Sequence, residues 1–251
     1  MGYYSPETIE LLKIDLDSIK QKRYVLNDKF IQLSSILVVE KAKEYLLHGT
    51  TRRLGIVVQC IDNIYSVFPP ERDQFLSVEE LKEVDINLHS FFINVYGFLD
   101  NLAWVFVLEK EINIHKNEVG MFLPKTKVNF KQEFREYIES SPVKRWFEEY
   151  LKDYRDTLSH RIPLYVPPKL LTPDQIQRDR EITKELNKNL KMGDFNAVDI
   201  LFSEQENLGS IAPIFRHSVY ESNGFVLHPQ IIIDFKTIEV IAIKYLEMFG
   251  I

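Results

Sequence analysis

An apolar stretch at about 78–112 most constrains the fold of this 251-residue chain, because it contains no proline and a single glycine. Ser77 and Glu80 stand three residues apart at its start, which is the spacing of a capping box, so we expect a helix to begin there. The middle of the stretch reads INLHSFFINVYGFLDNLAWVFV and is apolar almost all round a helix. Such a helix is buried on every side. The sequence therefore predicts a bundle with this helix at its centre.

Helical patterns also cover much of the remaining chain, which has only nine glycines and eleven prolines. Ser5 and Pro6 form an N-cap followed by proline, which predicts a helix that runs to about Lys22. Apolar residues recur at helical spacing over 27–68, and we expect an interruption at 49–51, where Gly-Thr-Thr occurs. Further helices are predicted at about 130–139, 142–159, 172–191 and 231–249.

The segment 163–230 is predicted to be an elaboration that precedes the last helix. Its helix at 172–191 has few apolar positions, so we expect it on the surface. Asn223 and Gly224 are a strong signal for a two-residue hairpin turn within 211–229. The predicted fold class is mainly α: a helical bundle with a small inserted helix and a β-hairpin near the C-terminus.

Composition indicates one soluble domain over residues 1–251. The formal net charge of −6 argues against a general nucleic-acid coat but leaves room for a small anion site. Cys60 is the only cysteine, which excludes a disulfide framework and a cysteine-based zinc cluster and fits a reducing compartment. The N-terminus lacks the pattern of a signal peptide, and polar residues break the apolar stretches before the length of a membrane span. We therefore expect a cytoplasmic protein that does not bind membranes.

The segment RDTLSH brings together Arg155, Asp156 and His160, which suit phosphodiester chemistry. Arginine is a fixed cation that binds phosphate, and histidine transfers protons near neutral pH. On an ideal helix Arg155 and His160 lie about 140° apart, so they converge only if the helix ends or distorts between them. The alternative is structural: Arg155 pairs with Asp153 or Asp156, and His160 is stabilised by the helix dipole.

Three strings resemble the HEPN superfamily (higher eukaryotes and prokaryotes nucleotide-binding), and specifically a branch of uncharacterised bacterial HEPN-like proteins. They are HGTTRR at 48–53, NVYGFLDNLAW at 94–104 and RDTLSHRIPLYVPP at 155–168. The last string contains the Arg-x4-His spacing of the superfamily, with a polar residue directly after the arginine. The resemblance implies an all-helical fold and a homodimer in which two motifs form one site.

Many proteins of that superfamily are metal-independent endoribonucleases of toxin–antitoxin, phage-defence or RNA-processing systems. By resemblance, Arg155 would hold the scissile phosphate, His160 would transfer a proton, Asp156 would orient either of them, and Arg161 would help to bind RNA. An antitoxin-like partner would then be expected. The alternative is a non-catalytic HEPN-like module that binds a nucleotide, a small anion or a partner protein.

Two further clusters of polar residues have open roles. Asp100 and Asn101 interrupt the apolar helix, and a buried carboxylate needs a partner. They could pair with Arg52 or Arg53, or they could orient the arginine and histidine of the motif. Arg52 and Arg53 stand at the predicted helix interruption, where they could bind an anion or form a solvated junction.

His217 and His228 are the remaining candidate pair for a metal. If Asn223 and Gly224 form the hairpin turn, residue 217 faces 230, and the two histidines become diagonal neighbours on one face. No third ligand is apparent, so we predict no metal. The chain has no phosphate loop, dinucleotide-binding glycine pattern or zinc-protease motif, so we predict no cofactor.

Overall fold

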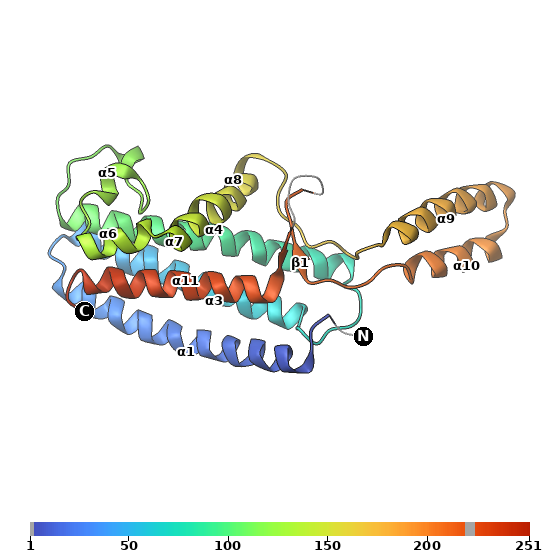
Figure 1. The fold of residues 1–251 in the computed structure, drawn as a ribbon, viewed down its shortest axis with the longest axis horizontal. Coiled ribbons are helices and arrows are strands. Elements are labelled where there is room, and N and C mark those ends of the chain that lie inside the picture. The colour runs from blue at the N-terminus through green and yellow to red at the C-terminus, as the bar shows by residue number, and fades with distance from the viewer. Residues whose placement is uncertain (1–2, 219–223) are drawn as a thin grey trace.

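Four long helices form the body of the protein, which a computed structural model describes at residues 3–218 and 224–251 (Figure 1). They are α1 (Pro6–Ile36), α3 (Thr51–Val67), α4 (Val78–Glu109) and α11 (Leu227–Glu247). Helix α3 packs along α4, and α1 packs along α11. The fold class is therefore mainly α, as predicted.

Helix α4 is the central helix that the sequence predicts. The Ser77 hydroxyl accepts the N–H of Glu80, and the Glu80 carboxylate accepts the N–H of Ser77, which completes the capping box. In the described part of the chain, α4 is the one helix long and apolar enough to cross a membrane, but most of that stretch is buried inside the protein. Burial of this kind is what the core helix of a soluble protein shows.

The first half of the chain breaks at a different place from the one predicted. Helix α1 continues past Lys22 to Ile36, and the chain then turns because the Glu109 carboxylate accepts the N–H groups of Val38 and Val39. The predicted interruption at 49–51 is wrong. Helix α2 (Glu40–Glu44) runs through a π-helical turn, η1 (Tyr45–Thr50), directly into α3.

A chain of short helices lies against α4 and α11, with α5 and α8 uppermost in Figure 1. It comprises η2 (Lys116–Glu118), α5 (Pro124–Lys127), α6 (Gln132–Glu139), α7 (Ser141–Arg145), the π-helical η3 (Trp146–Leu151) and α8 (Lys152–His160). Buried Asp234 of α11 accepts hydrogen bonds from Trp146 Nε1 at 2.8 Å and from the Tyr150 hydroxyl at 2.7 Å. This network fixes η3, and with it α8, on the bundle.

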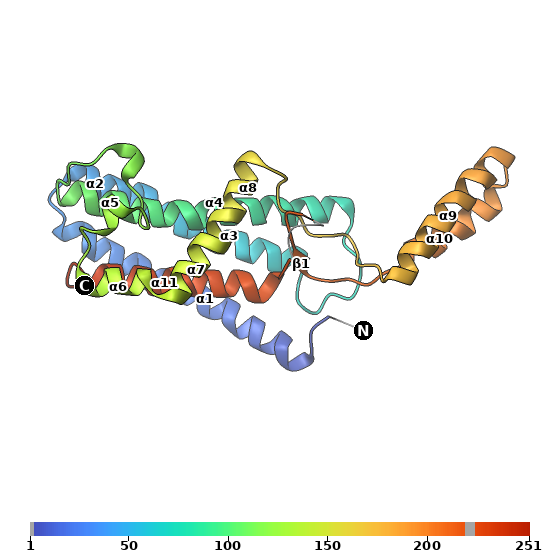
Figure 2. The ribbon, with the colours of Figure 1, turned by 45° about the horizontal axis from the view of Figure 1, so that its top comes forward.

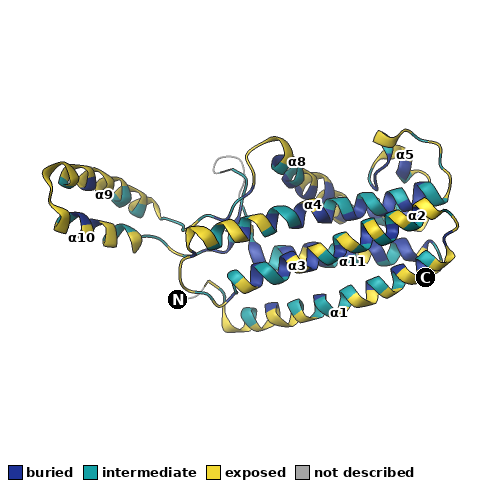
Figure 3. Ribbon diagram, turned by 180° about the vertical axis from the view of Figure 1, so that it is seen from behind, coloured by how far each residue is buried: buried dark blue, intermediate teal, exposed yellow. Residues whose placement is uncertain are grey.

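Beyond α8 the chain forms an arm, which we define as residues 172–208. It contains α9 (Pro173–Met192) and α10 (Phe195–Glu206), packed on each other and projecting from one end of the bundle in both Figure 1 and Figure 2. The sequence predicts α9 on the surface but misses α10. In the view from behind, the arm is largely exposed, whereas the bundle helices are buried where they face each other (Figure 3).

The predicted hairpin exists in a shorter form and with a different register. Strands β1 (Ile214–Phe215) and β2 (Phe225–Val226) are antiparallel, with Ile214 opposite Val226. Residues 216–224 connect them, so the prediction of a two-residue connection is wrong. Asn223 itself lies outside the described residues. Tertiary packing decides this register, because Phe215 is fully buried against the bundle.

Candidate functional site

Arg155 lies on α8 with its guanidinium against the side of α4. The guanidinium carbon sits 4.0 Å from the centre of the Tyr96 ring, and Nη1 lies 3.2 Å from Oδ1 of Asp156. The Arg155 side chain is 27% exposed, and its Nε is buried without a hydrogen-bond partner. The predicted Arg155–Asp156 pair is therefore present, and part of the guanidinium stays accessible.

Asp100 lies one helical turn after Tyr96 on the same side of α4. Burial raises the pKa of this carboxyl to about 6, while the positive charges of Arg155 and Arg53 act in the opposite direction. Within the described residues, no cation lies close enough to Asp100 to form an ion pair. Asp100 is thus a desolvated carboxyl between two arginines that it does not contact directly.

A cleft of about 210 Å³ opens beside Asp100. Its wall includes Tyr96, the loop that contains Gly120 and Phe122, and Phe147 and Lys152 of the following helices. The Phe122 and Phe147 rings stack at 3.8 Å, and Phe147 also stacks on Tyr96 at 5.5 Å. The cleft therefore combines an aromatic wall, the Asp100 carboxyl with its raised pKa, the Glu148 carboxylate and the Lys152 ammonium, and Arg155 rests on the Tyr96 ring.

His160 does not join this site within one protomer. Helix α8 is regular from Lys152 to His160, and the π-helical distortion precedes Arg155 rather than following it. The two motif residues therefore keep their separation of about 140° around the helix. The His160 side chain is exposed and makes no hydrogen bond or ion pair to any described residue, while neighbouring Arg161 pairs with Asp153 at 3.2 Å.

The two arginines of the 48–53 string point in different directions. Arg53 crosses Gly97 to donate to Asn94 Oδ1 at 3.1 Å, and a Cβ at Gly97 would collide with its guanidinium. Arg52 is exposed and donates to His48 Nδ1 at 3.0 Å. They do not form a joint anion site.

Asn101 is likewise separated from the cleft. It packs against Gly49, where its side chain occupies the space that a Cβ would need, and it lines a different surface cavity together with His48. Asp100 and Asn101 are adjacent in sequence and so lie about 100° apart around α4. Of this pair, only Asp100 lies near Arg155.

The predicted histidine neighbours belong to different elements. His217 lies 3.4 Å from Asp153, whereas His228 is buried in the first turn of α11. His228 donates through Nε2 to the Phe68 carbonyl at 2.6 Å, and Nδ1 accepts from the Tyr4 hydroxyl. Both nitrogens are occupied, so the histidine-pair interpretation is wrong. The described residues contain no cluster of three or more potential metal ligands.

Sequence reasoning did not single out several residues of the cleft. Tyr96 stands four residues before Asp100, a spacing that places both on one helix face, and this signal could have found it. Phe147 lies within the π-helical turn η3 and Lys152 follows it, and a π-helical turn shifts the α-helical period, so that period does not predict which way these two side chains point. Phe122 comes from a loop, which has no periodic signal at all.

We compared the chain with known proteins and found no match. No protein-family model, no curated protein and no solved structure matches this chain. The HEPN resemblance therefore stays a prediction that rests on the three strings.

Proposed function

We propose that this chain is a HEPN-like, cytoplasmic module that binds a nucleotide in the cleft beside Asp100. The observation that carries the proposal is the placement of Arg155, whose partly exposed guanidinium is held on Tyr96, next to a cleft that contains a desolvated carboxyl. Planar guanidinium groups bind phosphate oxygens. An ionised carboxylate accepts the N–H groups at the edge of a nucleobase.

The positions of the remaining groups suit the same ligand. Lys152 and Arg155 stand three residues apart on α8, so both cations face one side of that helix. Phe122 stands at the end of the ring stack and is partly exposed, so it provides the stacking surface for a planar base, and base–aromatic stacking contributes about 1–3 kcal/mol. A nucleotide would place its phosphate toward α8 and its base toward Asp100 and the stacked rings.

Thermal unfolding in the presence of AMP, adenosine or inorganic phosphate tests this proposal. We expect AMP to raise Tm more than adenosine or phosphate, because only AMP engages both the arginine and the aromatic wall. A ligand present at about one hundred times its Kd raises the free energy of unfolding by about 2.7 kcal/mol. Arg155→Gln should abolish the shift, while Arg145→Gln, on the preceding helix and outside the cleft lining, should preserve it. Equal shifts in both variants, or none with any nucleotide, would contradict the proposal.

The pKa of Asp100 gives an independent measurement. If ionised Asp100 accepts base N–H groups, AMP affinity weakens as pH falls below about 6. Asp100→Asn should bind AMP more weakly and keep only the pH dependence that comes from the AMP phosphate, whose second pKa is about 6. Calorimetric titrations of both proteins with AMP, from about pH 5 to about pH 7.5 in steps of about half a pH unit, would measure the pH dependence of the affinity. Parallel pH profiles for the two proteins would exclude a role for this carboxyl.

A second candidate is a metal-independent endoribonuclease, favoured by the exposed and unpaired His160. Because His160 and Arg155 diverge within one chain, this function requires a homodimer in which His160 of one protomer meets Arg155 of its partner. An antitoxin-like protein would then compete for the same face. Cleavage of end-labelled RNA in EDTA by the native chain, lost in His160→Ala and kept in His115→Ala, would support it. A monomer at micromolar concentration would exclude the shared site.

A further inference from the structure

A second cleft lies at the end of the bundle opposite the arm, apart from the site described above. Its cavity is about 470 Å³, within the range of small-molecule sites, which is about 300–1,000 Å³. It is formed where the end of α4, the start of α6 and the end of α11 meet. The lining residues are Phe106, Lys110, Ile112, Asn129, Lys131, Met248 and Phe249.

The floor of this end cleft is apolar and well packed. Phe106 and Met248 are 5% and 8% exposed, so packing holds both side chains in place, and the partly exposed Ile112 and Phe249 add apolar surface. The Phe106 ring contacts the Phe130 ring at 4.7 Å and the Phe249 ring at 6.3 Å. The floor therefore exists before any ligand arrives, which limits the ordering cost of binding.

The rim of the end cleft has two cations that no acid neutralises. Lys110 Nζ lies 5.6 Å from the centre of the Phe249 ring, and neither Lys110 nor Lys131 has an ion-pair partner among the described residues. Nearby lysines behave differently: Lys125 pairs with Glu118, and Lys127 pairs with Glu139, each at 2.7 Å. Both rim lysines therefore keep a positive charge that no described acid contacts directly.

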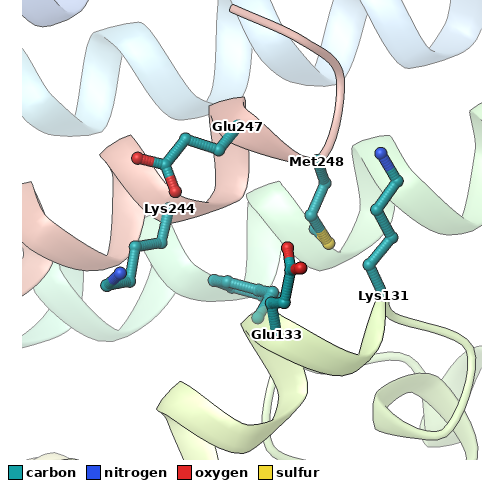
Figure 4. Close-up of a pocket in the computed structure, with 6 residues that line it drawn as sticks. Lys131, Glu133, Lys244, Glu247 and Met248 are labelled. Atoms are coloured by element: carbon teal, nitrogen blue, oxygen red, sulfur yellow. The ribbon is translucent and has the colours of Figure 1, made fainter.

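A small neighbouring cavity of about 70 Å³ shares Lys131 and Met248 with the end cleft. Figure 4 shows its acidic residues, Glu133 and Glu247, with Met248 between Glu247 and Lys131 and with the Lys131 side chain extending away from Glu133. The acidic groups therefore belong to the smaller cavity. The larger one keeps an apolar floor beneath a positive rim.

We propose that the end cleft binds an organic carboxylate with an aliphatic tail, with the carboxylate between Lys110 and Lys131 and the tail on Phe106, Met248 and Phe249. Burial of the tail supplies the affinity, since apolar contact area is the dominant favourable term. The two ammonium groups select an anion over a neutral molecule of the same length. This site is independent of the nucleotide cleft and uses none of its residues.

Calorimetric titration with octanoate, 1-octanol and acetate tests both halves of the proposal. Octanoate should bind with a saturable isotherm, and 1-octanol and acetate should each bind about tenfold more weakly, since one lacks the charge and the other lacks the tail. Amide chemical-shift changes should centre on Ile112 and Phe249. Absence of saturable octanoate binding at about 1 mM, or equal affinity for octanoate and 1-octanol, would overturn the proposal.

The matched variants use exposed lysines, so folding should be preserved. Lys110→Met combined with Lys131→Met keeps the apolar stems and should weaken octanoate binding about fivefold, with 1-octanol unchanged. Lys125→Met removes an ion-paired lysine outside the cleft and should bind octanoate like the native chain. Equal octanoate affinity in the double variant and the native chain would show that the rim does not recognise the anion.

Discussion

The bundle and the arm are both built from helices, but different interactions hold them together. The bundle buries a continuous apolar core that includes residues from α1, α3, α4 and α11. The arm has a separate core of four buried residues, Ile182, Leu186, Val198 and Leu201. On its surface Arg178 donates to both carboxylate oxygens of Glu204, at 2.6 and 2.7 Å.

Helix α9 has 20 residues, about as many as the bundle helices α3 and α11, so the difference in stability that we expect between the arm and the bundle comes from the size of their buried cores. Exposed ion pairs typically contribute about 0–1 kcal/mol, whereas one fully buried aliphatic or aromatic side chain contributes about 1.5–3 kcal/mol. Segments below about 40 residues rarely fold alone without added support. We therefore expect the arm to unfold locally while the bundle remains folded.

The largest expected effect comes from truncating the bundle core at Phe92. This ring is fully buried, stacks on Tyr154 at 5.3 Å and contacts the Tyr150 and Phe215 rings, so it joins α4 to η3, α8 and β1. Phe92→Ala should lower the free energy of unfolding by about 3–5 kcal/mol, measured by urea denaturation.

Ile182→Ala is the matched substitution in the arm, where Ile182 is also fully buried. It should leave the main unfolding transition unchanged and accelerate amide hydrogen exchange only within 172–208. A comparable loss of global stability in both variants would mean that the arm and the bundle unfold as one unit.

A smaller effect is expected from the buried titratable groups, which the bundle has and the arm core lacks. Burial raises the pKa of Asp234 from 3.8 to about 6. Between about pH 4 and 6 the folded chain therefore holds a proton that the unfolded chain has released. The stability that this proton contributes is lost as pH rises from about 4 to 6. Burial lowers the pKa of His228 from 6.5 to about 4, so its contribution has the opposite sign: stability is lost as pH falls from about 6.5 to 4.

Asp234→Asn should therefore steepen the rise of stability between pH 4 and 6, by about 1–3 kcal/mol across that range, because the His228 contribution is no longer offset by Asp234. Urea denaturation at several pH values measures the change. Asp199→Asn, an exposed position on α10, is the control and should leave the slope unchanged. A native-like slope in Asp234→Asn would show that Asp234 does not titrate in this range.

The smallest effect on the bundle should follow removal of the arm. The backbone groups of Leu170 and Ser210 exchange two hydrogen bonds of 2.9 Å, so the ends of the arm lie as close as residues that flank a tight hairpin turn. Replacing residues 171–209 with Asn-Gly should change the Tm of the bundle by less than about 3 °C. A larger loss would show that the arm supports the bundle, which would remove the contrast between the two regions.

Sequence patterns predicted those parts of the fold that depend on neighbouring residues in the chain. The Ser77–Glu80 capping box set the start of α4, and the periodic apolar pattern identified the bundle helices. The π-helical turns, the end of α1 and the hairpin register were not predictable in this way. Contacts with residues distant in sequence accompany them: Glu109 binds the backbone at the Val38 turn, and Asn101 packs on Gly49 of η1.

The candidate site likewise has features that the sequence predicted and features that only helix packing decided. Sequence alone selected Arg155 and Asp156 because their motif with His160 suits phosphodiester chemistry, and it selected Asp100 because a carboxylate inside an apolar helix must find a partner. Only the tertiary structure decided that Asp100 lines a cleft beside the Tyr96 ring on which Arg155 rests, that Asn101 lines a different cavity, and that His160 points away. The angular position of each residue follows from the helix, but the neighbour that it meets depends on how separate helices pack, and that packing is fixed by non-local burial.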